Sequence, residues 1–157
     1  MKNKDIKIVL WDYGGVLTES PFKNITEFER KNNLPKNTIV KINSRNPYDN
    51  AWARLEKNQI TIKEFVIQYK KEAAFFGIKN IEPYELLKCI IVSNNSKMID
   101  LLKLVSTKYS CSCLTNNFDL KQINNNFLKS KNIVCYFDHI FESSKIFLRK
   151  PEKEIYI

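Results

Sequence analysis

Three short stretches place polar side chains where group transfer could occur. Asp12 follows the apolar run IKIVLW, Thr115 follows CSCL, and Lys150 lies in a polar loop beyond FDHIFESS. In open α/β sheets, ligands bind at the carboxyl ends of the strands, so these side chains are expected to converge on one crevice. Asp12 would attack an electrophilic centre as a carboxylate nucleophile. Thr115 would donate a hydrogen bond to the transferred group, and Lys150 would supply positive charge.

Each of these residues alone also fits an ordinary structural role. An aspartate after a strand often caps the next turn, and Thr115 followed by two asparagines has the composition of a helix N-cap. An isolated lysine such as Lys150 is most often solvated. The catalytic interpretation therefore depends on the order of all three sites along the chain.

The chain between the first two sites has a helical pattern. Thr61 and Glu64 form a capping box at the start of the clearest helix, and Gly77 supplies its stop. No strand is needed between residues 22 and 92, so residues 19–93 are predicted to form an all-helical insertion after the first strand. The helices expected within it cover residues 22–32, 36–43, 51–58, 61–77 and 82–92.

Strands and helices alternate in the rest of the chain. The run at residues 6–11 is rich in β-branched residues and is predicted to be a fully buried strand of a parallel sheet. Further strands are expected at 111–115 and within 137–144, and helices at 96–107, at 118–130 and from about Pro151. This alternation predicts an α/β fold with a Rossmann-like parallel sheet. Its core would be discontinuous, formed by residues 1–18 and 94–157.

The predicted insertion offers few candidates for chemistry. Arg54 is the best candidate to contact an anion, and Asn50 could also reach a substrate. Trp52 lies at helical spacing with Leu55, which fits a packed core better than a binding site. His139 lies in a short apolar run with no evident partner, so a role as general base is not favoured.

The basic composition does not by itself indicate nucleic acid. The chain has 26 Lys and Arg against 17 Asp and Glu, a formal charge of +9, but the lysines are scattered rather than clustered. We therefore expect a small anionic substrate as the partner and no role in nucleic-acid binding.

The chain also carries no sign of membrane insertion or secretion. No stretch approaches the roughly 20 apolar residues of a membrane span. The N-terminus lacks the features of a signal peptide, so a cytoplasmic location with reduced cysteines is expected. Cys111 and Cys113 would face one side of a strand and are expected to be small core residues rather than metal ligands.

Taken in order, the motifs resemble the haloacid dehalogenase-like (HAD) hydrolase superfamily. IVLWDYGGVLT is similar to its first motif, CLTNN to its second, and RKPEKEIY to its third. The helical block between the first two motifs lies where one subfamily carries a helical cap, and NAWARLEKNQITIKEF is similar to cap sequences of that subfamily. The resemblance covers nearly the whole chain.

The resemblance implies a phosphatase acting on a small phosphorylated metabolite. Asp12 would be the covalent nucleophile, and Thr115 and Lys150 would hold the phosphoryl group. A Mg²⁺ ion would offset the charge between Asp12 and a phosphate, with Asp12 and Gly14 as its candidate ligands.

Other residues would bind the substrate. The backbone NH groups of Tyr13, Gly14 and Gly15 would cradle the anion. Asn116 would contact the substrate, and the cap would close over the site, with Arg54 as its candidate contact. Two alternatives remain open on these residues: a dehalogenase-like hydrolase and a non-catalytic HAD-like binding domain.

The sequence departs from the family pattern at two points. HAD phosphatases usually carry an acid two residues after the nucleophile, where this chain has Gly14. The loss of a general acid is worth roughly 10²–10⁴-fold in rate. The acidic pair of the fourth motif is also missing before Ile157, so we expect a fragment or truncated reading frame. Weak Mg²⁺ binding, low turnover and self-association through an exposed apolar sheet edge would follow.

Overall fold

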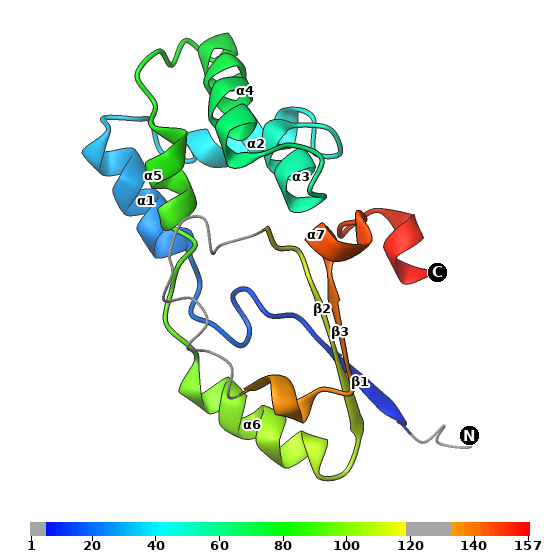
Figure 1. Ribbon diagram of the computed structural model, residues 1–157. Helices are drawn as coiled ribbons and strands as arrows, with labels where there is room; N and C mark the ends of the chain where they lie inside the picture. The colour runs from blue at the N-terminus through cyan, green and yellow to red at the C-terminus, as the bar shows by residue number, and fades with distance from the viewer. Residues whose placement is uncertain (1–5, 119–132) are drawn as a thin grey trace, which may run out of the picture.

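The structure, a computed structural model, describes residues 6–118 and 133–157. Three strands, β1 (Ile8–Trp11), β2 (Ser110–Thr115) and β3 (His139–Glu142), form a parallel sheet in the order β1-β2-β3 (Figure 1). Trp11 lies opposite Cys113, and Thr115 opposite Glu142, so the carboxyl ends of the three strands lie along one edge. The predicted α/β fold with a parallel sheet is confirmed.

The helical segment between Thr18 and Asn94, called the insertion below, leaves and rejoins the sheet at one place. Thr18 and Asn94 form an isolated antiparallel bridge. The NH of Glu19 donates to the carbonyl of Ser93 at 2.8 Å, and the NH of Asn95 donates to the carbonyl of Leu17 at 2.9 Å. These bonds hold the two ends of the insertion together beside the sheet.

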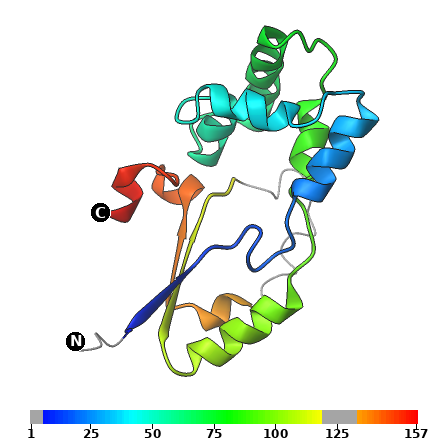
Figure 2. The same ribbon diagram turned by 180° about the vertical axis from the view of Figure 1, so that it is seen from behind.

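The insertion contains five helices near the ranges that the sequence predicted. Figures 1 and 2 show them as a group beyond the carboxyl ends of β2 and β3. The side chain of Asn50 caps α3, and the capping box of Thr61 and Glu64 opens α4. Gly77 follows α4 with a φ of +76°, which a glycine adopts without strain. The helices are α1 (Phe22–Lys31), α2 (Thr38–Arg45), α3 (Ala51–Glu56), α4 (Ile62–Phe75) and α5 (Pro83–Lys88).

The core of the insertion is aromatic. Phe65 and Tyr69 of α4 are fully buried, and the ring of Trp52 lies edge-on to Phe65 with centroids 5.8 Å apart. Trp52 also lies edge-on to Phe118, which follows β2, with centroids 6.3 Å apart. Phe118 therefore joins the core of the insertion to the end of the central strand, and Trp52 packs as the helical spacing predicted.

A second core lies on one face of the sheet. Trp11, Cys111 and Leu102 are buried together, the last from α6 (Ser96–Ser106). Cys111 and Cys113 are each 1% exposed, which confirms the prediction that they are small core residues.

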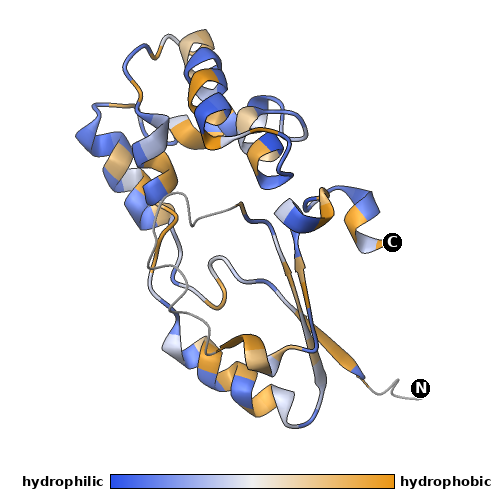
Figure 3. Ribbon diagram, viewed as in Figure 1, coloured by the Kyte–Doolittle hydropathy of each residue, from blue (hydrophilic) through white to orange (hydrophobic). Residues whose placement is uncertain are grey.

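The prediction that β1 is fully buried is wrong. Ile8 is 61% exposed and Leu10 is 55% exposed, although Figure 3 shows β1 as one of the most apolar strands. Within the described residues, α6 packs on the face that carries Val9 and Trp11, and alternate residues of an edge strand point to the opposite face. The apolar run therefore marks a strand with one covered face.

The C-terminal region is also less helical than predicted. β3 leads into the short helix α7 (Ser143–Ile146), and the RKPEKEIYI segment forms only the 3₁₀ turn η3 (Lys153–Tyr156). The helix predicted at 118–130 lies outside the described residues from 119 onward. Within the described part of the chain, no helix is long and apolar enough to cross a membrane.

Candidate active site

Asp12 and Lys150 meet at the carboxyl edge of the sheet. Asp12 directly follows β1, and Lys150 lies in the loop after α7. The Nζ of Lys150 lies 2.7 Å from Oδ1 of Asp12 and donates to the carbonyl of Leu114 at 2.8 Å. The Asp12 side chain is 44% exposed, so the carboxylate is held by the protein and still open to a ligand.

The turn after Asp12 is tightly bonded. The NH of Tyr13 donates to Oδ1 of Asp12 at 2.7 Å, and the NH of Gly15 donates to the hydroxyl of Thr18 at 3.0 Å. Gly15 has a φ of +75°, where an L side chain would be strained. A Cβ added at Gly14 would meet no atom within 4 Å, so space does not require a glycine there.

The end of β2 supplies a buried hydroxyl and a clamp. Thr115 is 7% exposed and its hydroxyl donates to the carbonyl of Asn116 at 3.4 Å. The amide of Asn116 makes two bonds to the main chain of Lys150: Nδ2 donates to the carbonyl at 2.9 Å, and Oδ1 accepts from the NH at 2.8 Å. Asn116 thus fixes the loop that carries the lysine, a role that sequence reasoning missed because its partner lies far along the chain.

A further group that the sequence did not reveal lies beside this clamp. Ser143 is fully buried; its hydroxyl accepts from the NH of Asn117 at 2.8 Å and lies 2.7 Å from the carbonyl of Glu56. The side chain of Asn117 donates to Glu142 at 2.6 Å, and Lys145 pairs with the same carboxylate. Glu142 is therefore occupied by protein groups at the end of β3.

Two other candidate residues, Arg54 and His139, do not contact Asp12 or Lys150. Arg54 forms a double hydrogen bond with Asp49, at 2.7 and 2.8 Å, and both residues belong to the insertion. An anion would therefore compete with Asp49 for the guanidinium. His139 begins β3, whereas the site lies beyond the strand's other end.

Cys113 lies next to Asp12 on the neighbouring strand, and the pKa of its thiol is raised. Burial, and then the negative charge of Asp12, raise the pKa of Cys113 to about 11. Its thiol therefore stays protonated at neutral pH, and Cys113 is a poor nucleophile.

The chain is similar to HAD enzymes of known structure. A HAD family enzyme from Bacteroides thetaiotaomicron, in complex with magnesium and inorganic phosphate, aligns with 97% of this chain and 76% of its own, with a TM-score of 0.61 and 23% identity. A predicted HAD-like family hydrolase from Porphyromonas gingivalis aligns with 96% of this chain and 73% of its own, with a TM-score of 0.61 and 18% identity. The chain therefore has a HAD-like fold, as its motifs predicted.

A curated mouse protein is similar in sequence. Acyl-CoA dehydrogenase family member 10 of Mus musculus is 28% identical over 158 residues, a match that covers 98% of this chain. The chain spans 14% of the length of that relative. No protein-family model matches the sequence.

The described residues offer only part of a magnesium site. Residues 6–118 and 133–157 contain no group of three or more His, Cys, Asp or Glu side chains that could hold a metal ion. Asp12 supplies one carboxylate, and its Oδ1 already faces Lys150. Since Mg²⁺ requires several oxygen ligands in octahedral geometry, these residues alone do not fit a tight site.

Proposed function

We propose that this chain is a HAD-like hydrolase that takes a phosphoryl group from a small phosphorylated metabolite onto Asp12. The observation that carries the proposal is the 2.7 Å contact between Asp12 Oδ1 and Lys150 Nζ at the carboxyl edge of the sheet. The ammonium group lies next to the proposed attacking oxygen, so it would stabilise the negative charge of the phosphoryl group during transfer. The magnesium and phosphate bound to the Bacteroides enzyme support the same class of reaction.

In the first step, a carboxylate oxygen of Asp12 attacks phosphorus, and the bond from phosphorus to the ester oxygen breaks. The leaving alkoxide takes its proton from water, because Gly14 has no side chain to donate one. In the second step, water attacks phosphorus and the bond to Asp12 breaks. Inorganic phosphate is released, and the carboxylate is regenerated.

The surrounding residues would bind the phosphoryl group. The hydroxyl of Thr115 and the NH groups of Tyr13, Gly14 and Gly15 are its proposed donors. The NH groups of Tyr13 and Gly15 have protein partners in the structure, so a ligand would have to replace those bonds. We propose that any Mg²⁺ binds weakly at Asp12 and the main chain of Gly14.

We further propose that residues 19–93 act as a cap and that residues 1–18 and 94–157 form the catalytic domain. The bridge between Thr18 and Asn94 supports this division, since the insertion joins the sheet domain at one narrow connection. The position of α1–α5 beyond the carboxyl edge of the sheet supports a role in enclosing the substrate. The bond between Arg54 and Asp49 would have to open for Arg54 to contact the substrate.

A second candidate is a HAD-like domain that binds a phosphate ester without turnover. Gly14 in the place of the usual acid and the incomplete set of metal ligands in the described residues favour it. A dehalogenase-like hydrolase is the third candidate, in which Asp12 would attack carbon and release halide.

Release of inorganic phosphate from p-nitrophenyl phosphate at millimolar Mg²⁺ tests the proposal. We expect release by the wild-type chain and none above background by Asp12→Asn, which keeps the shape of the side chain. Equal release by both proteins would refute the phosphatase. Binding of the ester without release would favour the second candidate, and release of halide from a 2-haloacid would favour the third.

A further inference from the structure

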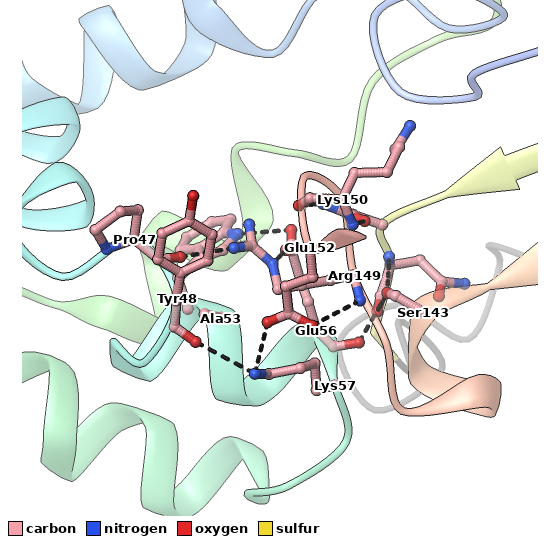
Figure 4. Close-up of polar contacts among 12 residues, drawn as sticks. Pro47, Tyr48, Ala53, Glu56, Lys57, Ser143, Arg149, Lys150 and Glu152 are labelled. Carbon is pink, nitrogen blue, oxygen red and sulfur yellow. Dashed lines mark hydrogen bonds and ion pairs between the residues drawn. The ribbon is translucent and has the colours of Figure 1, made fainter. Parts of the chain in front are cut away.

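Two ion pairs join the helical insertion to the loop that carries Lys150. Glu56, the last residue of α3, accepts a hydrogen bond from Nε of Arg149 at 2.7 Å. Its neighbour Lys57 donates to Glu152 at 2.8 Å. Figure 4 draws both pairs. All four side chains are 15% exposed or less, whereas the side chains of the other ion pairs within the described residues are more exposed.

The contacts around the first pair make it specific in geometry. Glu56 Oε1 accepts from Nε1 of Trp52 at 3.0 Å, so the carboxylate is held from both sides. Arg149 Nη1 donates to the carbonyl of Pro47 at 2.7 Å, so the guanidinium contacts the insertion at two points. Burial raises the pKa of Glu56, and the Arg149 guanidinium opposes that shift.

The pair bears directly on the candidate site because Arg149 precedes Lys150. The main chain of Lys150 is clamped by Asn116, and its Nζ reaches Asp12. The loop is thus fixed from the sheet by Asn116 and from the insertion by Glu56. A shift of about 1 Å in a positioned group can lower a rate roughly a hundredfold.

We propose that Glu56 and Arg149 are positioning residues through which the helical insertion holds Lys150 against Asp12. Its expected effect on rate rests on the function proposed above. The new element is that catalysis depends on contact between the insertion and the sheet domain. Movement of the insertion away from the sheet would separate Glu56 from Arg149 and release the lysine loop. The insertion would then control the position of Lys150 relative to Asp12 as well as the access of substrate to the site.

The experiment compares Glu56→Gln with Glu27→Gln. Both replace a glutamate that pairs with an arginine, but the Glu27 pair is exposed and lies within α1. The first readout is the rate at which an amine-reactive reagent acetylates Lys150 in the folded protein, measured by mass spectrometry of the digested peptides. The second is kcat and KM for p-nitrophenyl phosphate.

We expect Glu56→Gln to raise the acetylation rate of Lys150 at least about threefold and to lower kcat about tenfold or more, with KM changed less. Glu27→Gln should leave both unchanged. If Glu56→Gln does not fold, Arg149→Lys serves instead, because it keeps the charge and loses the two-point contact. Acetylation of Lys150 at the wild-type rate in a folded variant overturns the proposal. A wild-type chain that releases no phosphate refutes the proposed function, while the acetylation rates still decide the positioning role.

Discussion

The buried carboxylate of Glu29 is expected to be one of the largest single contributions to the stability of the helical insertion. Glu29 lies on α1 and is 4% exposed. Its two oxygens accept from the NH groups of Asn37 and Ile39, at 2.9 and 2.8 Å, at the start of α2. Asn37 is the N-cap of α2 but its own side chain makes no capping bond, so Glu29 provides the cap from another helix.

Replacing Glu29 with alanine removes both bonds, so the buried NH of Ile39 and the part-buried NH of Asn37 lose their acceptor. A hydrogen bond to a charged group contributes about 1.5–3 kcal/mol, and two bonds to one carboxylate are not fully additive. We therefore expect Glu29→Ala to lower the free energy of unfolding by about 3 kcal/mol. In a chain of this size that corresponds to a fall in Tm of about 6–12 °C.

The assay is thermal unfolding followed by the circular dichroism of the helices. Glu27→Ala is the matched control, because Glu27 lies on the same helix and pairs with Arg30 and Lys31 on the exposed surface. Exposed pairs contribute little, so its Tm should equal that of wild type. Equal Tm values for Glu29→Ala and Glu27→Ala would refute this account of the α2 cap.

Three further predictions concern the sheet domain. Cys135 should react with a thiol reagent at pH 8 before the buried Cys113, whose pKa is raised to about 11; labelling of Cys113 first, seen by mass spectrometry, would contradict this. Leu10→Lys should reduce self-association in sedimentation velocity, whereas Leu104→Lys, at a slightly more exposed position on α6, should not; equal effects would exclude the β1 face. Gly14→Asp, at a position with room for a Cβ, should raise kcat for an alkyl phosphate ester by about 10²–10⁴, because the added acid can protonate the leaving alkoxide; an unchanged kcat for that ester would argue against this role.

Local sequence rules predicted the helices of the insertion well. The capping box of Thr61 and Glu64 and the stop at Gly77 each act within a few residues, and the structure contains both. The positions of β2 and β3 followed from short apolar runs bounded by polar turns. These signals are readable because both partners of each interaction lie close together in the sequence.

The parts that could not be predicted depend on distant partners. The clamp of Asn116 on Lys150 and the pair of Glu56 with Arg149 join residues 34 and 93 positions apart. The exposure of β1 depends on what covers each face of the sheet, and an apolar run does not encode that. The bond between Arg54 and Asp49, in contrast, could have been predicted, because Asp49 lies only five residues before Arg54 in the sequence.

The convergence at the site was predictable only in outline. The order of Asp12, Thr115 and Lys150 along alternating strands and helices indicated a shared edge of the sheet, and the structure joins Asp12 to Lys150 directly. The hydrogen bond of the Thr115 hydroxyl to the neighbouring carbonyl of Asn116 could not be predicted from the sequence.

The most direct test of the central claim is the fate of Asp12 during a single turnover in ¹⁸O-labelled water. With protein in excess over a phosphate ester, the account predicts a phosphorylated peptide that contains Asp12, and ¹⁸O in the released phosphate but not in the Asp12 carboxylate. Incorporation of ¹⁸O into Asp12 would mean that water attacks carbon, as in a dehalogenase-like reaction. Phosphate release with neither a phosphorylated Asp12 peptide nor a loss of activity in Asp12→Asn would contradict the covalent role of this residue.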